Sequence, residues 1–246
     1  LTLPPFVRMQ DLKPADGKEV FILTDSVKIL GNRGKYDTVD YKQIHKQMWP
    51  LLSTHFIDLT MISVNGWQPK DILTAIAELV QAKAGGNPAA FDHVLIIMPT
   101  LFRQNELSGM GEEKIEKQKP EWGQWQERKD VSKKIGETLK QIKYKIVIWP
   151  GNTEEWKLTG NASYDITSAD LHLVFSENDV PVISGMPLHR RLEIDEFHFK
   201  AWPVDLDPFQ AYLAATIELT MQLATLKDAR HCLQTPTAHR KRTANP

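Results

Sequence analysis

The chain has 246 residues, with 30 Lys or Arg against 31 Asp or Glu, so its formal net charge is −1 at pH 7. A chain this evenly charged is not expected to bind nucleic acid through bulk charge, and 41% hydrophobic with 25% charged residues is typical of a globular domain. Composition therefore excludes disordered, collagen-like and coiled-coil proteins, and the single Cys232 excludes an intrachain disulfide.

The N-terminal residues, 1–18, contain several Pro and Gly residues without a helical or strand period, which predicts an irregular N-terminal arm. They lack the layout of a signal peptide, and the first residue is Leu, so a targeting segment would be absent from this chain or already removed. The longest uninterrupted apolar runs are only five residues, as in Val94–Met98, which predicts a soluble chain without a transmembrane segment. The compartment stays open.

Five short apolar segments, rich in β-branched and aromatic residues, are predicted to be strands: residues 19–24, 56–63, 93–98, 144–149 and 180–186. Between them lie segments with a helical period. In residues 68–84, apolar side chains recur on one face, Pro69 suits the first turn, and Gly85-Gly86 ends the helix. Residues 207–228 repeat apolar positions every four residues. This alternation predicts βαβ units and a parallel sheet covered on both faces.

Two segments depart from the alternation. Residues 108–128 are predicted to be a surface insertion, with a helix following from about Lys129. An alternative is a lid or a partner-docking arm that presents Trp122 and Trp125. Residues 231–246 are predicted to be a flexible basic tail, too weakly charged to indicate nucleic acid. The main domain would then span residues 19–230.

Polar residues and a glycine follow three of the predicted strands, and an acid–imidazole pair precedes the last helix. They are Thr24-Asp25-Ser26, Asn65-Gly66, Arg103-Gln104-Asn105-Glu106, and Asp195-Glu196-Phe197-His198. The carboxyl ends of parallel strands meet at one edge of a sheet, where ligands bind. A hydroxyl nucleophile, a histidine base with an orienting carboxylate, and donors for an oxyanion are the parts that acyl transfer needs.

These four blocks, in this order, resemble the SGNH (GDSL-like) serine hydrolase family over residues 19–228. The resemblance implies a flavodoxin-like α/β/α sandwich with a mostly five-stranded parallel sheet. It assigns Ser26 as the nucleophile, His198 as the base and Asp195 as the acid that orients it. It also implies an oxyanion hole made by the backbone N–H groups of Ser26 and Gly66 and the amide of Asn105.

Three residues depart from the family pattern: Thr24 and Arg103 replace glycines, and Glu106 replaces an aspartate. None of them removes a reacting atom, but Thr24 and Arg103 add bulk near the site. The candidates for the substrate pocket are Asp25, Trp67, Arg103 and Glu106, although Trp67 beside a strand is also consistent with core packing.

Each block also has an ordinary structural interpretation. Asp25-Ser26 is consistent with a turn or a helix N-cap, and Gly66 and Asn105 with loop residues. The Asp-x-x-His motif is weak by itself, since Asp228 and His231 form a second one, interpreted as a surface pair near the end of the last helix. The evidence for a site is the agreement of all four blocks in order and position.

No metal site or cofactor is predicted, because the remaining histidines lie on different elements without the spacing of metal ligands, and no glycine-rich phosphate loop is present. These histidines are interpreted as surface or core residues: His45, His55, His93, His172, His189 and His239. The sequence thus predicts a hydrolase acting on a small-molecule ester, a lipid acyl chain or an O-acetyl sugar. The alternative is a catalytically silent domain of the same fold that serves as a subunit of a larger complex.

Overall fold

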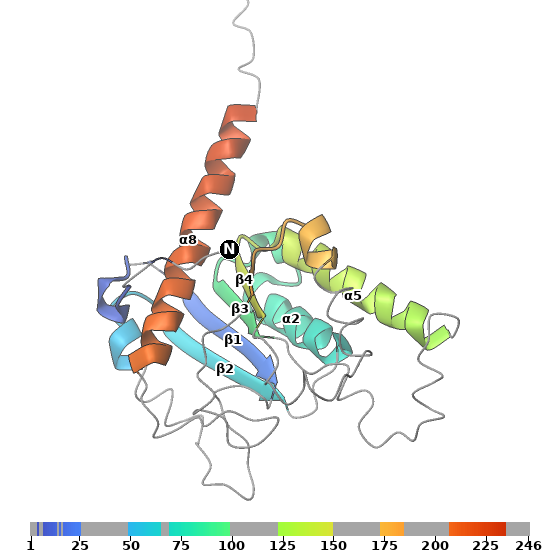
Figure 1. The fold of residues 1–246 in the computed structure, drawn as a ribbon, viewed down its shortest axis with the longest axis horizontal. Helices are drawn as coiled ribbons and strands as arrows, with labels where there is room; N and C mark the ends of the chain where they lie inside the picture. The colour runs from blue at the N-terminus through green and yellow to red at the C-terminus, as the bar shows by residue number, and fades with distance from the viewer. Residues whose placement is uncertain are drawn as a thin grey trace, which may run out of the picture.

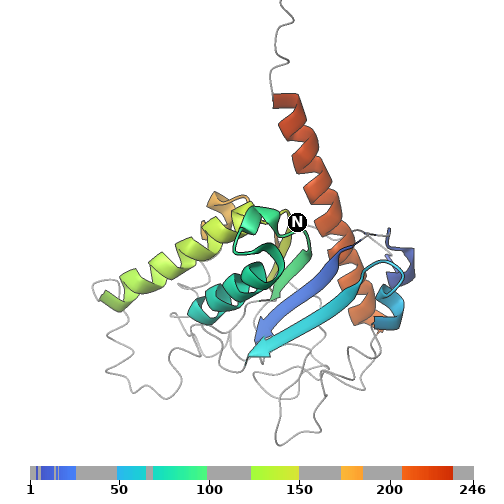
Figure 2. The ribbon, with the colours of Figure 1, turned by 180° about the vertical axis from the view of Figure 1, so that it is seen from behind.

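The computed structural model describes residues 4, 7–13, 15, 17–25, 49–64, 69–98, 123–149, 173–184 and 207–234. Figure 1 shows how the elements are arranged, and Figure 2 shows them from behind. In chain order the elements are η1 Met9–Asp11, β1 Glu19–Asp25, β2 Asp58–Val64, α2 Pro69–Ala84, η2 Pro88–Ala90, β3 Val94–Met98, α5 Gly123–Gln141, β4 Tyr144–Trp149, β5 Val182–Ser184 and α8 Asp207–Gln234.

The five strands form one sheet in the order β2-β1-β3-β4-β5, and every neighbouring pair is parallel. β1 is therefore flanked by β2 on one side and β3 on the other. The predicted parallel α/β architecture is confirmed, and the strand order is the doubly wound order found in flavodoxin-like folds.

Side chains alternate between the two faces of the sheet, and each face has its own core. In β1, Val20 and Ile22 belong to one hydrophobic cluster, whereas Phe21 and Leu23 belong to the other. β3 alternates in the same way, which is the period-two pattern of a strand buried on both faces. The sheet is therefore the middle layer of three.

Helices α2 and α5 cover one face, and α8 covers the other, as both views show (Figures 1 and 2). α8 contributes Leu213 and Ile217 to its cluster, together with Leu52 and Phe56 from the chain before β2. On the opposite face α2 contributes Ile72, Ile76 and Val80, and α5 contributes Ile135 and Leu139. The described end of the connection between β1 and β2, residues 49–57, thus contributes to the α8 face, whereas α2, between β2 and β3, lies on the other face.

Helix α2 begins and ends where its sequence predicts. Pro69 occupies the first position, where its missing N–H costs nothing, and Asp71 lies in the first turn. Gly85 and Gly86 have φ of 58° and 87°, in the left-handed region that favours glycine. The Gly86 amide donates to the Val80 carbonyl at 3.2 Å, which closes the helix.

Several boundaries differ from the predictions. α5 begins at Gly123, inside the predicted insertion 108–128, and α8 continues to Gln234, into the predicted tail 231–246. β5 begins at Val182, two residues later than predicted, because Pro181 cannot donate to a sheet ladder, and residues 185–186 of the predicted strand lie outside the described residues. The described residues of the predicted N-terminal arm do not project from the domain, since Met9 and Leu12 are buried in the core beneath α8.

Candidate active site at the carboxyl edge of the sheet

The strand register brings the starting points of three predicted site loops to one edge of the sheet. Asp25, the last residue of β1, pairs with Val64, the last residue of β2. Thr24 pairs with Met98, the last residue of β3. Neighbouring strands lie about 4.8 Å apart, so the chain leaves these three strands from adjacent positions.

The strand order makes this edge a topological switch point. β1 lies between β2 and β3, and the chain passes from β1 to β2 in one direction and from β2 over to β3 in the other. Because the strand order reverses between β1 and β3, a crevice is expected outside the carboxyl ends of these two strands, where open α/β sheets bind their ligands. The loop that begins with Ser26 starts there.

Most predicted site residues lie outside the described residues. These are Ser26, Gly66, Trp67, Arg103, Asn105, Glu106, Asp195 and His198. Asp25 is described as the last residue of β1, but its side chain is not. What the structure supplies is the position of each loop: one residue after β1 for Ser26, soon after β2 for Gly66, after β3 for Asn105, and between β5 and α8 for the Asp195–His198 block.

The second Asp-x-x-His motif has a different setting. Asp228 and His231 both lie within α8, which runs on to Gln234. They are therefore residues of a regular helix and not of a loop at the carboxyl edge. This placement agrees with the prediction that Asp228 and His231 are not the catalytic pair.

A polar cluster at the amino edge of β1 stabilises the start of that strand. Glu19 is 7% exposed, and its carboxylate is paired with Lys83 Nζ at 2.7 Å. The Glu19 amide donates to His93 Nδ1 at 3.0 Å. Burial lowers the pKa of His93, and the nearby Glu19 carboxylate partly opposes this. His93 also lies edge-on to Phe21 and Phe91, so it is a core histidine with a hydrogen bond, as predicted.

One pocket was not predicted from the sequence. It lies beside the first residues of β4 and is lined by Lys145 and by Lys227 of α8. The signal was present in the sequence, because Lys145 is a charged residue inside the apolar run of a strand predicted to be buried.

Within the described residues, no three His, Cys, Asp or Glu side chains come close enough together to hold a metal ion. The helices in that part of the chain are also too short or too polar to cross a membrane.

The chain matches no family model and no curated protein. Its fold is similar to several solved structures. A lipase/acylhydrolase from Enterococcus faecalis is 13% identical, with a TM-score of 0.49 over 85% of this chain and 96% of that one. A psychrotrophic esterase, EstA, from Pseudoalteromonas sp. is 11% identical, with a TM-score of 0.45 over 87% and 99%. A GDSL-like lipase from Bacteroides thetaiotaomicron is 10% identical, with a TM-score of 0.42 over 86% and 89%. These are distant likenesses of fold.

Proposed function

We propose that this chain is a serine hydrolase of the SGNH type that cleaves a carboxylic ester through an acyl-enzyme. One observation carries the proposal: the predicted Ser26, Gly66 and Asn105 blocks each follow the carboxyl end of a strand, and those three strands are adjacent in the sheet with β1 in the middle. If these residues were only an ordinary turn, a helix cap or a loop glycine, nothing would require them to follow three adjacent strands. Acyl transfer requires all of these groups around one carbonyl.

In this proposal Ser26 is the nucleophile. Its hydroxyl attacks the ester carbonyl carbon while His198 takes the hydroxyl proton, and the carbonyl electrons move onto oxygen. The tetrahedral intermediate then expels the alcohol, which receives that proton from His198. Water repeats the sequence on the acyl-enzyme and releases the acid. Asp195 orients the imidazole and stabilises its charged form.

The oxyanion would be held by three donors. Ser26 and Gly66, which would supply backbone N–H groups, follow the adjacent strands β1 and β2, whose last residues pair directly. The Asn105 amide would approach from the loop after β3, on the other side of β1. Loss of one such donor typically lowers turnover about 100- to 1000-fold, so Asn105→Ala should reduce kcat within that range.

The substrate in this proposal is an uncharged small-molecule ester, either a lipid acyl ester or an O-acetyl sugar. Asp25, Trp67, Arg103 and Glu106 are the proposed pocket residues. Thr24 and Arg103 carry side chains where the family pattern has glycines, which would narrow the pocket and favour a small acyl group.

A covalent probe tests the proposal directly. A fluorophosphonate reacts with an activated serine hydroxyl and leaves a stable adduct, so wild-type protein should be labelled and Ser26→Ala should not. Hydrolysis of p-nitrophenyl acetate should fall in parallel in Ser26→Ala and His198→Ala. Mass spectrometry of the labelled protein should place the adduct on the peptide that contains Ser26.

A matched control is available in the chain itself. His231→Ala removes the histidine of the second Asp-x-x-His motif, which lies in α8, and should leave labelling and turnover unchanged. Equal losses in His198→Ala and His231→Ala would contradict the assignment of His198 as the base. Folded wild-type protein that no fluorophosphonate labels would contradict the hydrolase proposal and favour the silent subunit of a complex.

A further inference from the structure

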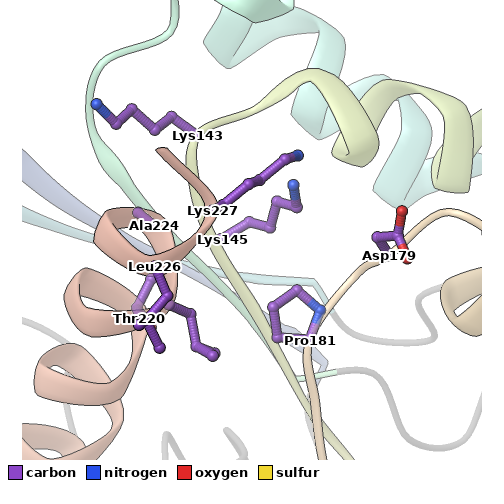
Figure 3. A pocket seen from close by; sticks show the side chains of 9 residues that line it. Lys143, Lys145, Asp179, Pro181, Thr220, Ala224, Leu226 and Lys227 are labelled. Carbon is purple, nitrogen blue, oxygen red and sulfur yellow. The ribbon is translucent and has the colours of Figure 1, made fainter. Parts of the chain in front are cut away.

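A pocket of about 310 Å³ lies at the amino end of β4, on the edge of the sheet opposite the candidate active site. Figure 3 shows its lining. Its basic and acidic side chains come from three places: Lys143 and Lys145 at the start of β4, Asp179 before β5, and Lys227 on α8. Its apolar lining includes Pro181, Leu223 and Ala224. The volume falls at the lower end of the range for small-molecule sites.

Lys145 is held in a defined position. It is 5% exposed, and its ammonium donates to the carbonyls of Ile142 at 2.8 Å and Lys140 at 3.2 Å. Both carbonyls lie at the carboxyl end of α5, where a cation is favoured by the unpaired carbonyls. The capping role accounts for two of the three N–H bonds of this ammonium.

The capping role does not account for the second lysine. Lys227 comes from α8 and lies against Lys145, so two ammonium groups face the same space (Figure 3). Burial, and then the charge of Lys227, lowers the pKa of Lys145 to about 8, although Asp179 opposes the shift. Lys143 also lines the pocket, but its ammonium points away from this pair (Figure 3) and lies over the Tyr144 ring, 5.2 Å from the ring centroid. Asp179 is the acidic residue of the lining.

We propose that this pocket binds a small organic anion, with its oxyanion head between Lys145 and Lys227 and a short apolar chain against Leu223 and Ala224. An anion between the two ammonium groups replaces their repulsion with two charge-assisted hydrogen bonds. The apolar side chains of α8 in the lining would be covered by a short hydrocarbon chain, so the pocket favours an organic anion over an inorganic one.

The proposal predicts proton uptake. An anion stabilises the charged form of Lys145, so binding raises the pKa of this lysine and takes up protons near pH 8. Affinity should fall as the pH rises above 8, because the neutral amine no longer attracts the anion. The other charged groups of the pocket lining around Lys145 are Lys143, Lys227 and Asp179.

Isothermal titration calorimetry of the full chain tests this proposal, with hexanoate as the probe and 1-hexanol and inorganic phosphate as the comparison ligands. Hexanoate should bind at pH 7, at least tenfold more weakly at pH 9.5, and with a heat at pH 8 that depends on the ionisation enthalpy of the buffer. Hexanol should bind at least tenfold more weakly than hexanoate. If phosphate bound as tightly as hexanoate, the proposed contact of a hydrocarbon chain with Leu223 and Ala224 would be overturned.

Charge-matched variants locate the site. Lys227→Gln should weaken hexanoate binding at least tenfold, and this residue is exposed, so its replacement leaves the core intact. Lys134→Gln removes the same charge from an exposed position of α5 outside the pocket and should bind hexanoate as wild type does. Equal affinities of wild type and Lys227→Gln would overturn the proposal. The outcome is independent of Ser26, so it is distinguishable from failure of the hydrolase proposal.

Discussion

Gly136 of α5 offers a test of how tightly the layer over the sheet is packed. A Cβ at this position would lie 2.5 Å from Val174 Cγ1 and 2.6 Å from Asn178 Nδ2, both closer than real contacts allow. Asn178 Nδ2 also donates to the Val174 carbonyl at 2.8 Å, so any movement of its side chain endangers that hydrogen bond. Gly136→Ala should therefore disturb the segment that leads into β5.

The sign of the effect depends on three magnitudes. Replacing glycine by alanine inside a helix gains about 1 kcal/mol of helix propensity. Overpacking a well-filled contact costs about 1 to 3 kcal/mol. Losing the hydrogen bond of Asn178 costs about 1 kcal/mol more. With overpacking near the middle of its range, the net destabilisation of Gly136→Ala is about 2 kcal/mol, which lowers Tm by roughly 4–8 °C in a chain of this length.

Chemical denaturation monitored by circular dichroism measures this change as a lower midpoint with an unchanged slope. The matched experiment repeats Gly136→Ala in a Val174→Ala background, where the contact with Cγ1 no longer exists and the cost should be smaller. A Gly136→Ala protein as stable as wild type would refute the argument, because it would show that helix propensity outweighs the close packing.

Two further predictions concern stability. Because the pKa of His93 is lowered in the folded chain, the unfolded chain binds a proton more readily, so this contribution to stability is complete above pH 6.5 and is lost as the pH falls through 6.5 toward the folded pKa. His93→Gln should abolish that part of the pH dependence of the free energy of unfolding, measured by urea titration. An unchanged pH profile in this variant would contradict the prediction. Ile96→Ala, fully buried in β3, should cost about 2–5 kcal/mol, whereas Ile57→Ala, 60% exposed, should change stability by less than about 0.5 kcal/mol, and equal losses would contradict the described core.

The elements that the sequence predicts well are those with a clear period and a clear end. Residues 144–149 match β4 at both ends, because an apolar run is bounded there by Lys143 and Pro150. α2 matches within one residue, since Pro69 and the Gly85-Gly86 pair mark its limits. Local signals decide such boundaries, and tertiary packing does not move them.

The predicted helix boundaries are wrong where a segment of helix-forming residues has no apolar period and no glycine or proline that ends it. The first turns of α5 contain helix formers such as Gln124 and Glu127 but no apolar stripe, so the sequence predicts a start at about Lys129, whereas the helix begins at Gly123. α8 continues past Asp228 because no glycine or proline interrupts it before Pro236.

No sequence pattern predicts the burial of Met9, because the residues around it follow no helical or strand period and Met9 is buried by contact with elements distant in the sequence. For the candidate site, the sequence could identify the residues at the strand ends, and the register confirms that β1, β2 and β3 end side by side. The distances between the site residues depend on loop conformations, which no periodic sequence pattern predicts.

The position of α8 has a consequence for synthesis. Ile22 and Ile96 are made early, yet part of the cluster on their face, including Leu213 and Ile217, lies in the last described element of the chain. On a ribosome, β1, β3 and β4 can pair before α8 exists, but one face of the nascent sheet then lacks the cover of this helix and is left partly exposed to water. A translation product arrested before residue 207 should therefore aggregate or occupy chaperones, whereas release of the completed helix allows the core to close in a single late step.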